Sequence, residues 1–457
     1  MNFLDNYQNI YFIGIAGSGM SALAQYLAGI GKTVSGSDRF FVSGQANETR
    51  DKLKAEGIQC FFQDGSGINS ETQLVIASTA VEETNVEMQK AKSLGIPVLL
   101  RSELLTLLSE TKKTIAVGGT SGKSTTTAML FEILDYGGFQ PSIISGAGLV
   151  KLQKQNKIGN AFVGKGDWLV IEADESDGSI VQYHPEVGLL LNIDKDHKEI
   201  DELLEIFQQF KKNTRRLFVV NASQPLTAQF SQNAANDFSY TEANAGYKAA
   251  DFSQQGFRTF FTINEVQFEL NAIGQHNMQN ALAATAVANQ VGVPLKICAE
   301  AIKNYEGIYR RNQVLGNKNG VWVIDDYAHN PAKVAAAIRS VQPLAQKVIA
   351  WFQPHGYGPT RFLRNDFVNE IAAALRPSDE IWMSEIFYAG GTTTKNVSAA
   401  DLINDLKLLG VNAFFVENRK DFIAEVKAHL EKDSAIILMG ARDPSLDEFA
   451  KEVFKTL

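Results

Sequence analysis

The chain contains an apolar run, TIAV at 114–117, that leads directly into the glycine-rich sequence GGTSGKSTTT at 118–127. Glycines allow successive backbone N–H groups to turn toward an anion, Lys123 supplies a point charge, and the Ser124 hydroxyl can bind Mg²⁺. Val117 stands where the longer G-x-x-x-x-G-K-S/T loop has its first glycine, so a shorter loop is implied. The pattern predicts a strand, a phosphate-binding loop and a helix. An ordinary glycine turn is the alternative, but it leaves the Lys-Ser pair unexplained.

Size and charge narrow the possible classes of protein. With 457 residues the chain is expected to form roughly three domains. Its net charge of -8 disfavours nucleic acid as the main partner. Cys60 and Cys298 are too far apart in sequence to suggest a disulfide framework or a cysteine metal site, which fits a reducing cytoplasm. The start lacks a signal-peptide pattern and no apolar run reaches about 18 residues, so no membrane association is expected.

Strand-like and helical stretches alternate along the chain, which predicts an α/β fold with three domains, at 1–112, 113–312 and 313–457. The first should be a Rossmann-like, doubly wound parallel sheet. The second should be a phosphate-loop α/β domain with extra antiparallel strands within 215–272, and the third should again be Rossmann-like. The expected strands are 10–15, 33–38, 74–77, 97–100, 114–117, 168–171, 187–191, 259–263, 321–326, 347–352, 380–383 and 435–439.

A second glycine motif follows the first predicted strand. Gly14, Gly17 and Gly19 have the spacing G-x-x-G-x-G, and Asp38 lies at about the distance at which a carboxylate holds a ribose hydroxyl. The position between a strand and a helix favours a phosphate-containing ligand over a purely structural turn. A nicotinamide-dependent oxidoreductase is one class that this motif allows, although it leaves Lys123 unused.

Three polar groups follow buried strands or a domain boundary. The acidic run EADESD at 172–177 should share an edge of the sheet with the phosphate loop, where Glu172 could bind Mg²⁺; a solvated acidic loop is the alternative. Asp196-His197 follows the next strand and predicts a second metal or phosphate contact. Arg310-Arg311 could reach a γ-phosphate, or could be a solvated basic linker.

The order of these motifs resembles that of the Mur ligases, which form amide bonds with ATP in bacterial cell-wall synthesis. The resemblance covers nearly the whole chain. It is carried by GIAGSGMS at 14–21, GSD at 36–38, GTSGKSTTT at 119–127, EADESD at 172–177, DH at 196–197, GQHNMQN at 274–280, RR at 310–311, DDYAHNP at 325–331 and FQPH at 352–355.

The resemblance implies two cofactors, ATP and Mg²⁺, and a role for each matched residue. The implied catalytic residues are Lys123, Glu172, His197 and Arg311, and the implied metal ligands are Ser124, Glu172 and His197. The implied ATP contacts are Gly119, Thr120, Ser121, Gly122, Lys123, Ser124, Thr125, His276, Asn277, Asn280, Arg311 and Asp326. The first glycine motif becomes a UDP-sugar site with Gly14, Ala16, Gly17, Ser18, Gly19, Met20, Ser37, Asp38, Ser78, Thr79 and Ala80. His329 and His355 are expected near the amino-acid substrate.

The implied reaction joins L-alanine to UDP-N-acetylmuramic acid through an acyl phosphate in the bacterial cytoplasm, by a monomer or homodimer. A murein tripeptide is the alternative amine substrate. Gly356 and Arg442 depart from the family motifs, and both lie in the domain that would select the amine. Ser121 also departs, since it stands where the family has histidine. A catalytically silent UDP-sugar-binding homologue is a third possibility, against which the four implied catalytic residues argue.

Overall fold

The structure is a computed structural model that describes residues 3–78, 81–176, 178–195, 198–241, 244–388 and 394–457. It divides into two compact units. One comprises Met1–Ala250, Thr262–Phe268 and Asn280–Ile308, and the other comprises Asp251–Phe261, Glu269–Gln279 and Tyr309–Leu457. Among the helices in the described ranges, none has the length and apolar character needed to cross a bilayer.

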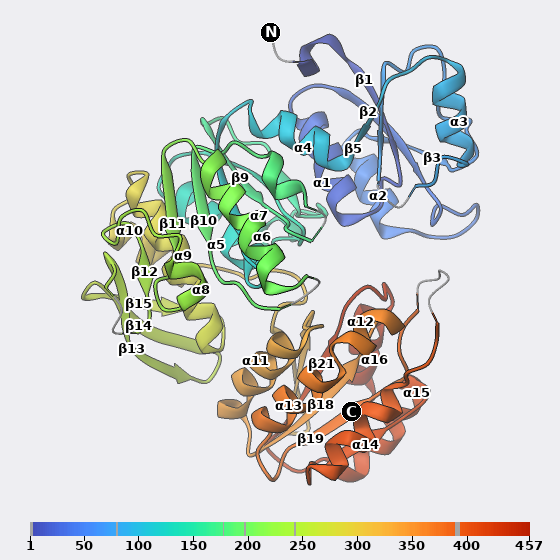
Figure 1. The fold of residues 1–457 in the computed structure, drawn as a ribbon. Helices are drawn as coiled ribbons and strands as arrows, with labels where there is room; N and C mark the ends of the chain where they lie inside the picture. Colours follow the sequence, from blue (N-terminus) through green and yellow to red (C-terminus); the bar gives the residue numbers. More distant parts are fainter. Residues whose placement is uncertain (1–2, 79–80, 177, 196–197, 242–243, 389–393) are drawn as a thin grey trace. The chain divides into compact units, whose positions relative to one another are not determined.

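The first sheet has the order β3-β2-β1-β4-β5, and all its pairs are parallel. This order reverses direction at β1, which confirms the predicted doubly wound sheet (Figure 1). Its strands are β1 (Asn9–Ile13), β2 (Thr33–Asp38), β3 (Gln59–Phe62), β4 (Leu74–Ala77) and β5 (Val98–Leu100). Its helices are η1 (Phe3–Asn6), α1 (Ser18–Gly29), α2 (Glu48–Ala55), α3 (Val86–Ser93) and α4 (Arg101–Ser109).

The second sheet has the order β11-β10-β6-β9-β7-β8 and is parallel except for the β7–β8 pair. Central β6 lies between β9 and β10, so the carboxyl ends of these strands meet at one edge. The strands are β6 (Lys113–Gly118), β7 (Ser142–Ile144), β8 (Ala161–Phe162), β9 (Trp168–Glu172), β10 (Val187–Leu190) and β11 (Leu217–Val220). The helices are α5 (Lys123–Tyr136), α6 (Val150–Gln153), η2 (Ser179–Gln182), α7 (Ile200–Asn213) and α8 (Pro225–Ala228).

A smaller sheet, β12-β13-β14-β15, confirms only part of the antiparallel prediction. Two-residue turns join β13 to β14 and β14 to β15, as antiparallel neighbours allow. The prediction is wrong for β12, which pairs in parallel with β13, and for β11, which extends the central parallel sheet. The elements are β12 (Phe238–Ser239), β13 (Tyr247–Gln255), β14 (Arg258–Ile263), β15 (Val266–Leu270), α9 (Gln275–Gln290) and α10 (Leu295–Lys303).

The last sheet has the order β16-β17-β21-β18-β19-β20 and is parallel except for its edge strand β16. Its strands are β16 (Gln313–Lys318), β17 (Val321–Asp326), β18 (Lys347–Gln353), β19 (Glu380–Met383), β20 (Ala413–Phe415) and β21 (Ser434–Gly440). Its helices are α11 (Pro331–Val341), η3 (Gln342–Leu344), α12 (Tyr357–Phe362), α13 (Arg364–Ala374), α14 (Ala399–Leu408), α15 (Arg419–Glu425), η4 (Val426–His429) and α16 (Leu446–Thr456).

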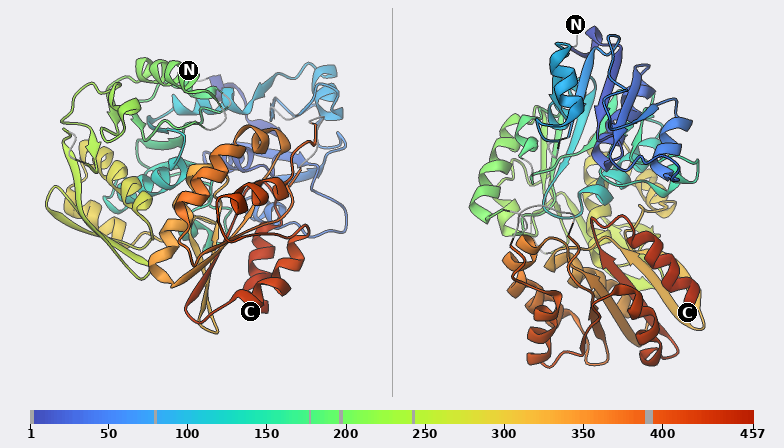
Figure 2. Two further views of the ribbon diagram at one scale, coloured as in Figure 1. Left: turned by 60° about the horizontal axis from the view of Figure 1, so that its bottom comes forward. Right: turned by 90° about the vertical axis from the view of Figure 1, so that its right-hand side faces the viewer.

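Helices cover both faces of this last sheet, which is drawn in orange to red in Figure 2. Alternate residues of β18 enter different cores because side chains of a strand alternate between its faces. Val348 and Phe352 pack in the core that includes α11, α13 and α14. Trp351 packs in the other core, where its ring lies 4.7 Å from that of Phe449 on α16. The Rossmann-like prediction for this segment is therefore confirmed.

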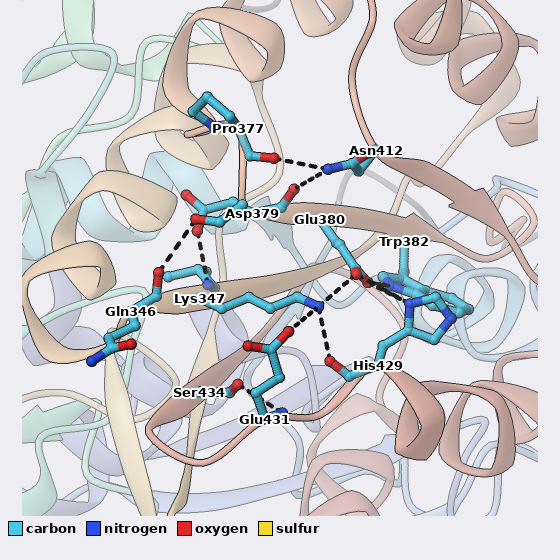
Figure 3. A network of polar contacts seen from close by, with 12 residues as sticks. Gln346, Lys347, Pro377, Asp379, Glu380, Trp382, Asn412, His429, Glu431 and Ser434 are labelled. Atoms are coloured by element: carbon cyan, nitrogen blue, oxygen red, sulfur yellow. Dashed lines mark hydrogen bonds and ion pairs between the residues drawn. The ribbon is translucent and has the colours of Figure 1, made fainter.

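A buried polar network lies at the amino end of β18 and β19 (Figure 3). The Glu380 carboxylate, 6% exposed, accepts hydrogen bonds from Lys347 Nζ (2.8 Å), Trp382 Nε1 (2.9 Å) and His429 Nδ1 (3.1 Å). Burial would raise the pKa of Glu380, but these donors lower it below its ordinary value. Lys347 also contacts Glu431, at 3.4 Å, whose side chain is 71% exposed.

We expect Glu380→Gln to lower the free energy of unfolding by about 1.5–3 kcal/mol at pH 7, because it removes the main counter-charge of Lys347, whose side chain is 13% exposed. Glu431→Gln is the matched control, and it should cost less than about 0.5 kcal/mol. Because the folded pKa of Glu380 is depressed, the stability it provides is present at neutral pH and is lost as pH falls through that pKa. Urea unfolding at pH 7 and pH 3.5 measures the free energy of unfolding of both variants. Equal losses in Glu380→Gln and Glu431→Gln would contradict the role given to Glu380.

Glu132 on α5 is a buried carboxyl, 6% exposed, whose Oε1 lacks a hydrogen-bond partner within the described part of the chain. Burial raises its pKa to about 8 from an ordinary value of 4.5, with Lys151 acting in the opposite direction. The folded protein therefore retains a proton here that the unfolded chain releases. Stability from this group is fully present below about pH 4.5 and is lost as pH rises through about 8.

We expect Glu132→Gln to stabilise the protein, with a gain that grows between pH 5 and pH 8.5 to about 2–4 kcal/mol. Urea unfolding at these two pH values measures the gain. Asp135→Asn is a suitable control because Asp135 lies on the same helix, is partly exposed and pairs with Lys151 at 3.0 Å. A gain of equal size at both pH values would contradict the expected protonation.

Candidate active site

The glycine-rich loop predicted to bind phosphate, called the phosphate loop below, lies between β6 and α5, as expected of a strand, loop and helix. Gly119 and Gly122 have φ values of 129° and 82°, which favour glycine. A Cβ on Gly122 would lie 2.4 Å from Asn280 Oδ1, and one on Gly119 would lie 3.1 Å from Asn192 N. Both glycines are therefore required by backbone conformation and by close neighbours. Asn280 is thereby placed against the loop, and its Oδ1 also accepts a hydrogen bond from Thr126 Oγ1 at 3.3 Å.

Asn192, just beyond β10, holds the middle of the loop. Its Oδ1 accepts from Ser121 N (2.7 Å) and Thr120 Oγ1 (2.9 Å), and its Nδ2 donates to Ser121 O (3.0 Å). Thr120 is 1% exposed, so its side chain supports the loop from within. The Ser121 hydroxyl is buried and, within the described residues, has no hydrogen-bond partner. A phosphate oxygen is a chemically suitable partner for such a hydroxyl.

The Lys123 ammonium is held by the loop and by the acidic run. Nζ lies 2.8 Å from Gly119 O, 2.6 Å from Glu175 Oε2 and 3.8 Å from Asp174 Oδ1. Burial opposes its charged form, but Glu175, Asp174 and Glu172 outweigh that effect and raise the pKa of Lys123. The lysine is therefore fully charged at neutral pH.

The described part of the acidic run, 172–176, is partly buried. Glu175 is only 3% exposed. Burial would raise the pKa of Asp174, but Lys123, the Ser176 N–H and Arg101 lower it below its ordinary value. Asp177 lies outside the described residues, as do Asp196 and His197, so the predicted histidine ligand stays a prediction.

Glu172, the last residue of β9, faces the start of α5. Its Oε1 accepts a hydrogen bond from Ser124 Oγ at 3.0 Å, and its Oε2 accepts from Gly146 N at 2.8 Å and Ser145 Oγ at 3.4 Å. A serine hydroxyl and a carboxylate are the oxygen donors that Mg²⁺ prefers, and nucleotide phosphates commonly complete such a site. Among the described residues, no cluster of three His, Cys, Asp or Glu side chains could hold a metal ion. The donor set therefore fits Mg²⁺ bound together with a nucleotide.

The glycine motif after β1 forms a tight loop at the start of α1. Gly14 N and Ile15 N donate to Ser37 O, and both Asp38 oxygens accept backbone N–H groups, from Ala16 at 2.9 Å and Phe40 at 3.0 Å. Asp38 is 5% exposed and thus shapes the loop. The ribose contact predicted for Asp38 remains a prediction.

The other predicted UDP-sugar residues differ in position. Ser37 is fully buried and its hydroxyl bonds to Glu87, so it lies behind the loop. Ser78 follows β4, whereas Thr79 and Ala80 lie outside the described residues. Arg101, which was not predicted, has its side chain beside the loop, where a Cβ on Gly19 would be 3.0 Å from Arg101 Cδ.

The remaining predicted site residues lie mainly in the other compact unit. Arg310 is 7% exposed and pairs with Asp325 through Nε (2.8 Å) and Nη2 (3.1 Å). The Arg311 guanidinium lies over the Tyr327 ring at 4.6 Å, and that of Arg310 lies over the same ring at 5.5 Å. The two arginines therefore have different environments, and the linker interpretation is wrong for Arg310, which is buried and ion-paired.

Near them, Asp326 accepts hydrogen bonds from Asn312 N (2.6 Å) and Ala328 N (2.7 Å), so both of its oxygens contact the backbone. His276 Nε2 lies 3.1 Å from Asn312 Nδ2, and burial lowers the pKa of His276. Asn277, on the same turn of α9, donates to Ile273 O at 2.8 Å.

His329 and His355 lie together, with ring centroids 5.6 Å apart. His329 Nδ1 is 2.9 Å from Tyr327 O, and burial, with Lys333, lowers the pKa of His329 well below its usual value. His329 is therefore neutral at pH 7. A neutral imidazole has one ring nitrogen that can accept a proton, whereas both ring nitrogens of an imidazolium are donors.

Comparison with known proteins agrees with this geometry. The sequence models "Mur ligase family, catalytic domain", "Mur ligase middle domain" and "Mur ligase, glutamate ligase domain" match residues 9–113, 117–288 and 310–442. The chain is 34% identical to UDP-N-acetylmuramate–L-alanine ligase of Carboxydothermus hydrogenoformans, over 94% of this chain and 93% of that protein. It is 32% identical to the enzyme of the same name from Pelotomaculum thermopropionicum, over 96% of both.

Solved structures show the same architecture. The UDP-N-acetylmuramate–alanine ligase of Thermotoga maritima superposes with a TM-score of 0.79 at 26% identity, covering 98% of both chains. A murein peptide ligase from Psychrobacter arcticus superposes with a TM-score of 0.69 at 20% identity, again over 98% of both chains, and supports the fold alone.

Proposed function

We infer a function for this chain from the family to which it belongs, the Mur ligases. The proposed reaction is the ATP-dependent joining of L-alanine to UDP-N-acetylmuramic acid, a step of peptidoglycan synthesis. The observation that carries this proposal is identity above 30%, over nearly the full length, to ligases that bear this activity in their names. The formed phosphate loop, with a charged Lys123 and Glu172 at its mouth, supports ATP use.

ATP is proposed to bind at the phosphate loop, with its phosphates on the amino end of α5 and on Lys123. Ser124 and Glu172 would hold Mg²⁺, together with His197. When bound, the ion would neutralise phosphate charge. UDP-N-acetylmuramic acid is proposed to bind at the glycine loop 14–20. His329 and His355 are the proposed contacts of the amine.

The reaction then needs two transfers. A carboxylate oxygen of the UDP-sugar attacks the γ-phosphorus of ATP, the bond to the β-phosphate oxygen breaks, and ADP leaves. Lys123 and Arg311 stabilise charge on the transferring group. The amine of alanine next attacks the carbonyl carbon of the acyl phosphate, and phosphate leaves with the bonding electrons. His329, through the ring nitrogen that does not face Tyr327 O, is the proposed acceptor of the proton that the amine loses.

The domain bounds 1–112, 113–312 and 313–457 remain our proposal, supported by the start of β6 at Lys113 and of β16 at Gln313. A location in the bacterial cytoplasm and a monomeric or dimeric state are also proposed. Two free cysteines are compatible with that location.

A substrate panel tests the function. Purified protein with ATP, Mg²⁺ and UDP-N-acetylmuramic acid should release phosphate when L-alanine is added, and mass spectrometry should find the UDP-N-acetylmuramoyl-alanine product. The L-alanyl-γ-D-glutamyl-diaminopimelate tripeptide and glycine are the comparison amines. Turnover with the tripeptide and none with alanine would replace the proposed acceptor. No ATP turnover with any amine, despite binding of the UDP-sugar, would indicate a silent homologue.

A further inference from the structure

Asn160, the residue before β8, is a buried polar side chain that the reaction does not use directly. It is 2% exposed. Its Nδ2 donates to Ser18 O at 2.7 Å and to Ser21 Oγ at 3.0 Å, and its Oδ1 accepts from Gln25 Nε2 at 2.7 Å. Every hydrogen-bonding atom of this amide therefore contacts α1, the helix that begins at the glycine loop.

The backbone of Asn160 is linked by hydrogen bonds to Glu172, beside the phosphate loop. Its carbonyl oxygen accepts a hydrogen bond from Ser145 N at 2.9 Å. Ser145 Oγ and Gly146 N both bond to Glu172 Oε2, whose other oxygen accepts from Ser124 Oγ. A continuous chain of hydrogen bonds thus runs from the glycine loop, through Asn160 and Glu172, to the phosphate loop.

Two features make this chain of contacts stiff. β8 pairs with β7 through Ile144 and Ala161, so Asn160 and Ser145 stand next to each other at the end of a strand ladder. The glycine loop is fixed in turn by Asp38 and by the Ser37 carbonyl. Removing the amide would take one hydrogen bond from each of Ser18 O, Ser21 Oγ and Gln25 Nε2, which would keep only their bonds within α1. Helix α1 could then shift relative to Glu172.

We propose that Asn160 is a positioning residue that fixes the UDP-sugar loop relative to Glu172 and the phosphate loop. This inference rests on the proposed function, in which a carboxylate bound at the first site attacks a phosphate bound at the second. Such a reaction requires the two groups to be close and aligned, and a displacement of about 1 Å can cost about 10²-fold in rate. Asn160 touches neither substrate in this account.

The test compares Asn160→Ala and the isosteric Asn160→Asp with Gln25→Met. Asn160→Asp keeps the acceptor for Gln25 but cannot donate to Ser18 O. Gln25→Met removes a hydrogen bond from the same buried group and leaves the Ser18 contact intact. We expect both Asn160 variants to lose about 10²-fold in kcat and Gln25→Met to stay within about threefold of the wild type.

Binding separates positioning from simple loss of structure. Calorimetry should give Kd values for UDP-N-acetylmuramic acid alone and for a non-hydrolysable ATP analogue alone within about threefold of the wild type in the Asn160 variants. Thermal unfolding should show folded protein for all three variants, and Asn160→Asp serves if the alanine variant does not fold. Unchanged kcat in the Asn160 variants, a loss confined to KM for the UDP-sugar, or an equal kcat loss in Gln25→Met would overturn the inference. Wild-type protein without turnover would contradict the proposed function, and with it this role.

Discussion

Lys123→Met is expected to lower ATP-dependent phosphate release by at least about 10³-fold, because it removes the cation that the transferring phosphoryl group needs. Methionine keeps the aliphatic stem, so packing around the loop is retained. Binding of UDP-N-acetylmuramic acid, measured by calorimetry, should change less than about threefold, since the glycine loop does not involve this residue. Equal losses of turnover and UDP-sugar binding would mean that the two sites are misplaced.

One side effect must be separated from catalysis. Lys123→Met leaves the buried Glu175 carboxylate without its 2.6 Å partner, which should destabilise the protein. The double variant Lys123→Met/Glu175→Gln removes that charge and should recover thermal stability without recovering turnover. If the double variant were active, the loss in Lys123→Met would come from the unpaired carboxylate.

Arg310 and Arg311 are expected to give opposite phenotypes although they are neighbours. Arg311→Ala should lower kcat by about 10²–10³-fold and leave stability nearly unchanged, because its guanidinium contacts the Tyr327 ring and is proposed to reach a phosphate. Arg310→Ala should instead lower the free energy of unfolding by about 3–5 kcal/mol. It leaves the carboxylate of Asp325, which is 1% exposed, without its ion-pair partner.

Phosphate-release kinetics give kcat for both variants, and urea unfolding gives their free energies of unfolding. Arg310→Lys and Arg311→Lys are the charge-conserving controls, and the first should still be destabilised because lysine cannot form the bidentate contact with Asp325. A catalytic loss confined to the Arg310 variants, or a stability loss confined to the Arg311 variants, would reverse our assignment.

The features that sequence predicted well are local ones. The phosphate loop could be found because glycines at 119 and 122 meet a backbone requirement within a few residues of Lys123. Strands such as β1, β6 and β18 of the three mainly parallel sheets could be found because each is a short apolar run with a helix after it.

What sequence could not give depends on contacts between distant residues. Asn192 and Asn160 look like ordinary loop asparagines, yet they bond to residues 71 and 142 positions away. Asp38 was predicted to contact a ligand from its spacing alone, which could not show that its oxygens accept hydrogen bonds from Ala16 N in the glycine loop and from Phe40 N after β2. Spacing gives the position of a side chain on an element but not the partner to which it turns. The difference between Arg310 and Arg311 has the same origin, because only the fold decides which of two adjacent side chains turns inward.

The pairing of Lys123 with Glu175 and Asp174 has one more consequence. A phosphate that approaches this ammonium meets a cation already neutralised by carboxylates, so nucleotide binding at this point is an exchange of anions. The attraction that ATP feels from a distance is correspondingly weak. Selectivity for the nucleotide must then come from short-range fit to the loop backbone, which a competing simple anion cannot reproduce.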